Sequence, residues 1–196
     1  MSPGPQKQFD RDDVLERAMQ LFWAEGYEAT GMTRILEQVG IGRQSLYDTF
    51  GDKRGLFLET LAHYFRTRMG PVMAQLRAPE SPVGNIRKVV AMLEAEAKRG
   101  HFHGCLVGNT AAEIAASDPE IAAKLAAYFR AIEDAFHDTF VRAQKAGEIN
   151  AGLDPRDLAR VFLHTLQGVA VVSQALRDPE MASSVIRSSL SLLTAC

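Results

Sequence analysis

A polar stretch from Arg43 to Lys53 holds side chains whose chemistry suits nucleic acid. An arginine fork can hydrogen-bond guanine and a glutamine amide can pair with adenine, so Arg43 and Gln44 are candidate base readers. Hydroxyl and ammonium groups suit phosphate oxygens, a role open to Tyr47, Thr49 and Lys53. The stretch therefore predicts a surface that reads base edges and holds the phosphate backbone.

Asp48 is the exception in this stretch, because phosphates repel a carboxylate. It should accept a hydrogen bond from a cytosine amino group or pair with Arg43 or Gln44. Lys53 directly follows Asp52, which is a good N-cap residue. The lysine ammonium and the N-terminus of the next helix are therefore both placed to meet a phosphate.

Two short helices must position these side chains. Ile35 and Val39 recur at helical spacing in the first, and Gly40 stands where the chain must turn. Leu46 and Phe50, four residues apart in the second, share a face that should pack on the first helix. This is the sequence form of a helix-turn-helix, whose second helix enters the DNA major groove. The alternative is an ordinary amphipathic helix pair, and periodicity alone does not separate the two.

A longer pattern surrounds these two helices. It reads Gly26-Tyr27-Glu28-Ala29-Thr30, Ile35, Gly40-Ile41 and Leu46-Tyr47-x-x-Phe50-x-x-Lys53-x-x-Leu56. This pattern resembles the DNA-binding domain of the tetracycline-repressor (TetR) family, and the likeness extends from about residue 9 to residue 65. The resemblance implies that the second helix is the recognition helix. Its base-reading positions then hold Arg43, Gln44 and Ser45, and the phosphate-binding positions hold Tyr47, Thr49 and Lys53.

The sequence departs from the family pattern at two positions. Gly31 stands where the family often has a Ser or Thr that caps the second helix and touches a phosphate, and Leu36 replaces a frequent alanine. We expect Thr30 or Thr33 to take over the phosphate contact. The candidate DNA-binding residues are therefore Thr30, Thr33, Arg43, Gln44, Ser45, Tyr47, Asp48, Thr49 and Lys53.

The resemblance implies an all-α chain with two domains. An N-terminal three-helix helix-turn-helix domain would occupy residues 9–68, and a C-terminal helical domain for effector binding and dimerisation would occupy residues 69–196. About nine helices are expected, and no run alternates with period two over any length. Outside the helix-turn-helix, the expected helices are 10–25, 53–76 with an interruption at Gly70-Pro71, 83–99 and 105–116, followed by three that begin at Asp118-Pro119, Asp154-Pro155 and Asp178-Pro179.

Composition and charge limit the class of protein. The chain has 196 residues, 46% hydrophobic residues and a net charge of −2, which does not by itself indicate a nucleic-acid binder. Any positive field must be local, around Arg34, Arg43, Lys53 and Arg54. No signal peptide or membrane-length apolar run is evident, and two cysteines suit a reducing compartment, so we expect a cytoplasmic protein without a membrane partner.

The segment from about 155 to 195 carries more apolar residues than one layer of helices can bury. Small residues such as Gly168 and Ala170 permit close helix approach. A large exposed apolar patch marks an interface, so we expect a homodimer. In the resembled family these helices form a four-helix bundle with their two-fold mates. The predicted DNA partner is then a pseudo-palindromic double-stranded operator.

Polar groups interrupt the apolar faces of the middle helices. Each could be a surface residue or a satisfied core group, but the resemblance favours a mostly apolar effector cavity with a few polar anchors. The expected effector is a partly apolar small molecule. The candidate lining residues are Phe102, Cys105, Leu106, Asn109, Glu113, Phe129, Ile132, Phe136, Phe162 and Gln167.

Cys105 permits a second interpretation, because it lies at a predicted helix N-terminus beside His101 and His103. Such surroundings favour the reactive thiolate, which makes a thiol-based redox or electrophile sensor an alternative to a buried structural cysteine. The three residues lack a fourth metal ligand, so no metal or cofactor is expected.

The leading interpretation is a ligand-responsive transcriptional repressor, although the sequence does not separate repression from activation. A helical small-molecule carrier or enzyme is the rival from another class. The chain shows no nucleophile elbow, glycine-rich phosphate loop or helical metal motif, so we expect no enzymatic activity.

Overall fold

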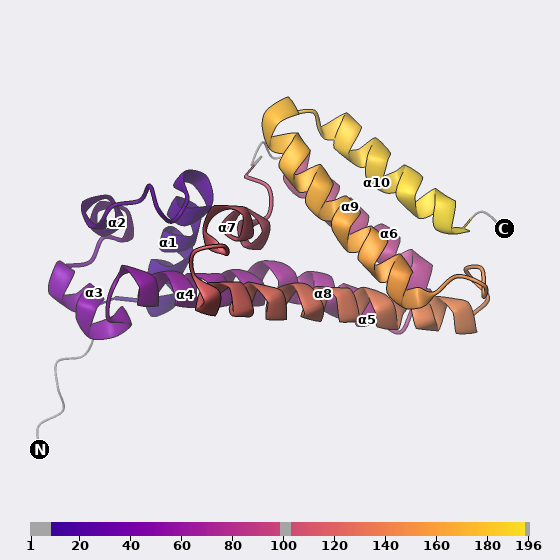
Figure 1. The fold of residues 1–196 in the computed structure, drawn as a ribbon, viewed down its shortest axis with the longest axis horizontal. Helices are drawn as coiled ribbons and strands as arrows, with labels where there is room; N and C mark the ends of the chain where they lie inside the picture. Colours follow the sequence, from indigo (N-terminus) through magenta and orange to yellow (C-terminus); the bar gives the residue numbers. More distant parts are fainter. Residues whose placement is uncertain (1–8, 99–102, 195–196) are drawn as a thin grey trace, which may run out of the picture.

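The computed structural model describes residues 9–98 and 103–194, and over these ranges the chain is helical without any strand (Figure 1). Two helices of eight residues and two longer ones form a head at one end, and the remaining helices form an elongated body. The helices are α1 (Arg11–Glu25), α2 (Met32–Val39), α3 (Arg43–Phe50), α4 (Lys53–Tyr64), the π-helical segment η1 (Phe65–Met69), α5 (Gly70–Arg77), α6 (Pro82–Lys98), α7 (Leu106–Ile114), α8 (Pro119–Lys145), α9 (Pro155–Leu176) and α10 (Pro179–Thr194).

The helix expected over 53–76 is present, with its interruption one turn earlier than expected. α4 passes through η1 into α5, and Pro71 stands in the first turn of α5. Proline has no N–H to donate to the carbonyl four residues earlier, so the regular hydrogen-bond pattern cannot be kept across this region. With α4, η1 and α5 taken as one interrupted helix, the described residues form nine helices, and the expected all-α fold is confirmed.

Each of the three Asp-Pro pairs begins a helix, as the sequence predicts. The carboxylates of Asp118, Asp154 and Asp178 accept hydrogen bonds from backbone N–H groups two and three residues further on, at 2.6–3.2 Å. The backbone N–H groups of Asp157 and Arg156 lower the pKa of Asp154. The caps fix where α8, α9 and α10 start, and with them the directions of the body helices.

The Asp154 cap makes the free energy of unfolding depend on pH. Because its pKa is lower in the folded state, its stabilisation is present above the unfolded pKa of about 3.9 and is lost as pH falls through the folded value. Asn caps nearly as well as Asp but does not titrate. We therefore expect Asp154→Asn to lose less stability than wild type between about pH 5 and pH 2. Urea unfolding at a series of pH values measures this difference; parallel losses in both proteins would contradict it.

Two apolar cores hold the molecule together. The first joins α1–α4 to residues of α7 and the first half of α8, among them Leu106, Ile114 and Ile121. The second lies in the body between α5, α6, α8, α9 and α10, around Phe136 and Phe162. The head therefore does not close its core alone, because α7 and α8 supply part of it.

Within the described ranges, no helix is long and apolar enough to span a bilayer. The same ranges contain no group of three or more His, Cys, Asp or Glu side chains placed to hold a metal ion. His101, one of the histidines considered beside Cys105, lies outside the described residues.

Candidate nucleic-acid interface and effector cavity

The turn between α2 and α3 is built as the sequence predicts. Ile35, Val39, Leu46 and Phe50 are all buried, so the apolar faces of the two helices both contribute to the core of the head. Gly40 closes α2 in the left-handed conformation with φ of 73°, which favours glycine because it has no Cβ. The opposite face of α3 is left free for another molecule.

That free face of α3 carries the predicted base readers. Arg43, Gln44, Tyr47 and Asp48 are exposed, whereas Ser45 is half-buried. The Gln44 amide donates to Asp48 Oδ1 at 2.8 Å, which is one of the two pairings expected for that carboxylate. This bond neutralises part of the repulsion between Asp48 and phosphate, and it holds the Gln44 amide in one orientation.

The two threonines proposed for a phosphate contact differ in exposure. Thr30 is fully buried, and its hydroxyl donates to the Gly26 carbonyl, so the candidacy of its side chain is wrong. Thr33 is exposed in the first turn of α2. Because Gly31 provides no side-chain cap, the first N–H groups of α2 have no partner from that residue and suit a phosphate together with Thr33.

The local positive charge is smaller than the sequence suggests. Arg34 pairs with Glu25 at 2.9 Å, and Arg54 pairs with Asp118 at 3.1 Å. Lys53 Nζ lies 4.4 Å from the centre of the Tyr27 ring, a cation–π arrangement. Of the four basic residues expected to attract DNA, Arg43 and Lys53 form no ion pair with a carboxylate in the described part of the chain.

A cavity with a volume of about 870 Å³ lies where the head meets the body. Gln20 and Trp23 of α1 form part of its wall, opposite residues of α6, α8, α9 and α10. Four of the ten predicted lining residues face it, namely Cys105, Ile132, Phe136 and Gln167. Its wall is mostly apolar, as expected for a site that binds a small organic molecule.

Five other candidates are placed outside the cavity, and Phe102 lies outside the described residues. Leu106 and Phe162 are fully packed in the two cores, and Phe129 packs between them. The Asn109 amide donates to the His103 carbonyl at 2.7 Å. Glu113 is exposed and accepts from backbone N–H groups of the head (see below). Periodicity identifies the buried face of each helix but not which neighbour that face meets.

Several cavity residues were not among the sequence candidates. Tyr64 is buried and lines the wall, and its hydroxyl donates to Cys105 Sγ at 3.8 Å. Burial, followed by the neighbouring Cys105, raises the pKa of Tyr64 well above its usual value. Arg68 lies on the same wall, and so does Ser173, whose Oγ is buried and finds no hydrogen-bond partner within residues 9–98 and 103–194. No motif marks these positions, because they meet only through the fold.

Glu113 joins the body to the head. Its two carboxylate oxygens accept from the backbone N–H groups of Tyr27 at 3.1 Å and Glu28 at 2.7 Å, at the turn between α1 and α2. The turn is tight here, since a Cβ on Gly26 would lie 3.0 Å from the same carboxylate. Together with the ion pair between Arg54 and Asp118, this contact holds the corner between α7 and α8 against the head.

Removal of the Glu113 carboxylate should loosen this turn. Glu113→Ala takes the acceptor from two backbone N–H groups, so we expect the Tyr27 and Glu28 amides to exchange with solvent about tenfold faster. Amide hydrogen exchange followed by NMR measures this change. Glu37→Ala, an exposed acid on α2, serves as the control and should leave these two amides unchanged. Unaltered exchange in Glu113→Ala would mean that the contact does not hold the turn.

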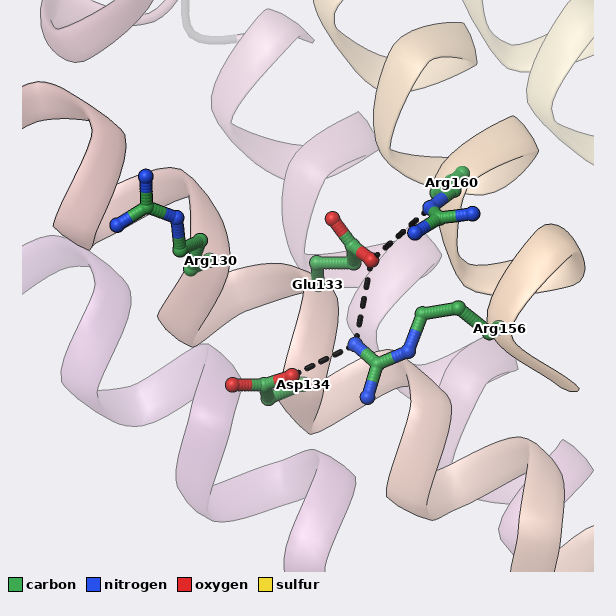
Figure 2. A pocket seen from close by; sticks show the side chains of 5 residues that line it. All are labelled: Arg130, Glu133, Asp134, Arg156 and Arg160. Atoms are coloured by element: carbon green, nitrogen blue, oxygen red, sulfur yellow. Dashed lines mark hydrogen bonds and ion pairs between the residues drawn. The ribbon is translucent and has the colours of Figure 1, made fainter.

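A second, smaller hollow lies between α8 and α9, with a volume of about 310 Å³ (Figure 2). Glu133 accepts from Arg156 at 3.2 Å and from Arg160 at 3.3 Å, and Asp134 accepts from Arg156 at 2.6 Å. Arg130 lies apart from these pairs in Figure 2. These ion pairs link Glu133 and Asp134 of α8 to Arg156 and Arg160 of α9, so they help to hold the two helices together.

Comparisons with known proteins agree with this arrangement. A family model described as "Bacterial regulatory proteins, tetR family" matches residues 14–60, and one described as "Tetracyclin repressor-like, C-terminal domain" matches residues 82–189. The HTH-type transcriptional regulator YezE of Bacillus subtilis is 34% identical over 196 residues, which cover 97% of this chain and 99% of the relative. The HTH-type transcriptional repressor ComR of Escherichia coli is 30% identical over 172 residues, with coverage of 87% and 82%.

Solved structures extend the comparison to the whole fold. A cysteine mutant of the TetR family transcriptional regulator CifR, complexed with 26-bp double-strand operator DNA, has a TM-score of 0.85 at 28% identity and covers 95% of this chain and 98% of its own. A regulatory protein TetR from Rhodobacter sphaeroides has a TM-score of 0.83 at 25% identity, with coverage of 91% and 96%. This chain therefore belongs to the TetR family and is a DNA-binding transcriptional regulator.

Proposed function

We propose that this regulator is a repressor that binds a pseudo-palindromic operator as a homodimer and is released by a small molecule in the 870 Å³ cavity. One observation carries the proposal: head helix α1 forms part of the cavity wall. A molecule that changes this wall acts directly on α1, which packs against α2 and α4 of the head. The linkage is reciprocal, so operator DNA must weaken effector binding by the same factor.

The proposed DNA contacts are the exposed face of α3 and the phosphate ligands on either side of it. Arg43 and Gln44 read bases, and Tyr47, Lys53 and Thr33 hold phosphates. This division predicts that the first two decide sequence preference, while the others set affinity for any sequence.

The proposed dimer uses the outer faces of α9 and α10. Val161, Val171, Val172 and Leu176 of α9 are 45–60% exposed, and Val185 of α10 is 40% exposed. Gly168 has open space where a Cβ would stand, so another helix can approach closely there. A two-fold dimer would place two recognition helices roughly 34–36 Å apart on successive major grooves.

Selection of bound sequences from a random DNA pool, repeated at two salt concentrations, tests the proposal. We expect an enriched inverted repeat, which then serves as the probe for effector screening. Weak, salt-sensitive binding without a motif would mean that α3 does not read sequence, and a small-molecule carrier would then be the better assignment.

A thiol-based sensor is the second candidate, because Cys105 lies on the cavity wall and accepts a hydrogen bond from Tyr64. In that case an electrophile in the cavity modifies the sulfur and the operator is released. Cys105→Ser would abolish the response to electrophiles but leave operator binding intact. A response that persists in this variant would remove the thiol mechanism and leave the non-covalent one.

A further inference from the structure

Arg68 connects the cavity to the reading head. It belongs to η1, lines the cavity wall, and forms an ion pair with Glu16 of α1. Its side chain is 37% exposed, so its guanidinium is accessible to a molecule in the cavity. Among the described residues that line the cavity, Arg68 is the one arginine or lysine.

Glu16 does not depend on Arg68 alone. Its carboxylate also accepts a hydrogen bond from Gln20 Nε2 at 3.0 Å and lies 3.1 Å from His63 Nε2. If Arg68 turned to another anion, Glu16 would keep these two partners. The Glu16 carboxylate would therefore not be left without a hydrogen-bond partner, which lowers the free-energy cost of the exchange.

The other charges on the wall do not replace Glu16. Glu94 of α6 forms its ion pair with Arg187 of α10 at 3.1 Å, and Glu96 is exposed near the end of the same helix. An acidic molecule that enters the cavity can therefore meet a guanidinium whose present partner is a surface carboxylate with 36% exposure.

The other residues of the cavity wall indicate which chemical groups the bound molecule needs besides an acidic one. Ile132, Phe136, Leu163 and Ile186 offer carbon surface. Ser173 is 8% exposed, and its Oγ has no hydrogen-bond partner among the described residues. A buried hydroxyl without a partner costs free energy, and a polar atom on a bound molecule removes that cost. The wall thus suits an apolar molecule that carries a few polar atoms.

We propose that the effector is a small organic carboxylate with an apolar body, and that its carboxylate takes the place of Glu16 on Arg68. The inference rests on the proposed function, in which this cavity is the effector site. Arginine binds a carboxylate through two parallel hydrogen bonds, which gives geometric selectivity as well as affinity. The exchange breaks the Arg68–Glu16 ion pair and leaves the Arg66–Asp12 pair as the other ion pair between η1 and α1, so the ligand prefers a state in which the head is less firmly held.

Three probes of equal chain length test the chemical class: octanoate, octan-1-ol and octylammonium. Each is titrated calorimetrically into the full-length protein. Because a hydrogen-bonded charge pair is involved, octanoate should bind at least about tenfold more tightly than octan-1-ol, and octylammonium should bind most weakly. Arg68→Gln should remove the preference for octanoate and leave octan-1-ol binding unchanged.

Two further variants distinguish ligand exchange from a structural role of Arg68. Glu16→Gln removes the competing charge, so octanoate should bind about three- to tenfold more tightly while octan-1-ol is unaffected. Arg66→Gln is the matched control, since Arg66 also belongs to η1 but pairs with Asp12 and does not line the cavity. It should change neither affinity.

The inference is overturned if the alcohol or the ammonium binds as tightly as octanoate, if octanoate fails to bind, or if its preference survives Arg68→Gln. The proposed function is tested separately with selected operator DNA. Octanoate binding through Arg68 without a specific operator would overturn the repressor and keep the carboxylate site. Release of the operator only by non-acidic molecules would overturn the carboxylate site and keep the repressor.

Discussion

Arg43→Ala combined with Tyr47→Ala should abolish specific operator binding while the fold and the cavity remain intact. Both side chains lie on the exposed face of α3, and neither belongs to a core. A bidentate arginine–guanine contact is worth about 1–3 kcal/mol, and a dimer loses it twice. The operator dissociation constant should therefore rise by about a hundredfold or more at constant salt.

Fluorescence anisotropy with labelled operator measures this loss, and thermal unfolding and effector titration check the rest of the molecule. Glu37→Ala is a suitable control, because Glu37 is exposed on α2 rather than on α3. If the double variant lost effector binding but kept the operator, α3 would not be the reader.

Val172→Glu should separate the dimer and thereby remove operator binding. Val172 is 45% exposed on the outer face of α9, four residues from Gly168 and Leu176, at the centre of the apolar surface. In a two-fold interface the two introduced carboxylates would lie near each other in a place without water. We expect the dimer dissociation constant to rise by about a hundredfold or more.

Analytical ultracentrifugation over a range of concentrations measures the dimer, and anisotropy at the same concentrations measures operator binding. Val172→Thr keeps the shape without a charge and should remain dimeric. A Val172→Glu protein that stays dimeric would place the interface elsewhere, whereas a monomer that still binds full-length operator tightly would show that dimerisation is not required.

The head could be predicted from the sequence because its signals are local. Apolar spacing at Ile35, Val39, Leu46 and Phe50 and a glycine between the two helices determine the turn, and all four apolar residues are buried as expected. The Asp-Pro helix starts are equally local, since each carboxylate bonds N–H groups two and three residues away.

The cavity could be predicted only in part, because its wall comes from segments far apart in the chain. Gln20 and Arg68 are ordinary surface residues by their spacing, and only tertiary packing places them beside Ile132 and Phe136. Glu113 was predicted to line the cavity because a carboxylate on an apolar helix resembles a ligand anchor. Its carboxylate instead accepts hydrogen bonds from backbone N–H groups of the head. The predicted phosphate contact of the Thr30 side chain is wrong for a similar reason, because its hydroxyl donates to the Gly26 carbonyl.

The shared core of head and body limits how this regulator can be re-engineered. Leu106 and Ile114 of α7 and Ile121 of α8 complete the apolar surface behind α1 and α4. A DNA-reading module transplanted from a relative onto this body would meet side chains shaped for a different neighbour. Exchange of operator specificity is therefore simpler by substitution on α3 than by a domain swap, because Arg43, Gln44, Tyr47 and Asp48 on the outer face of α3 are exposed.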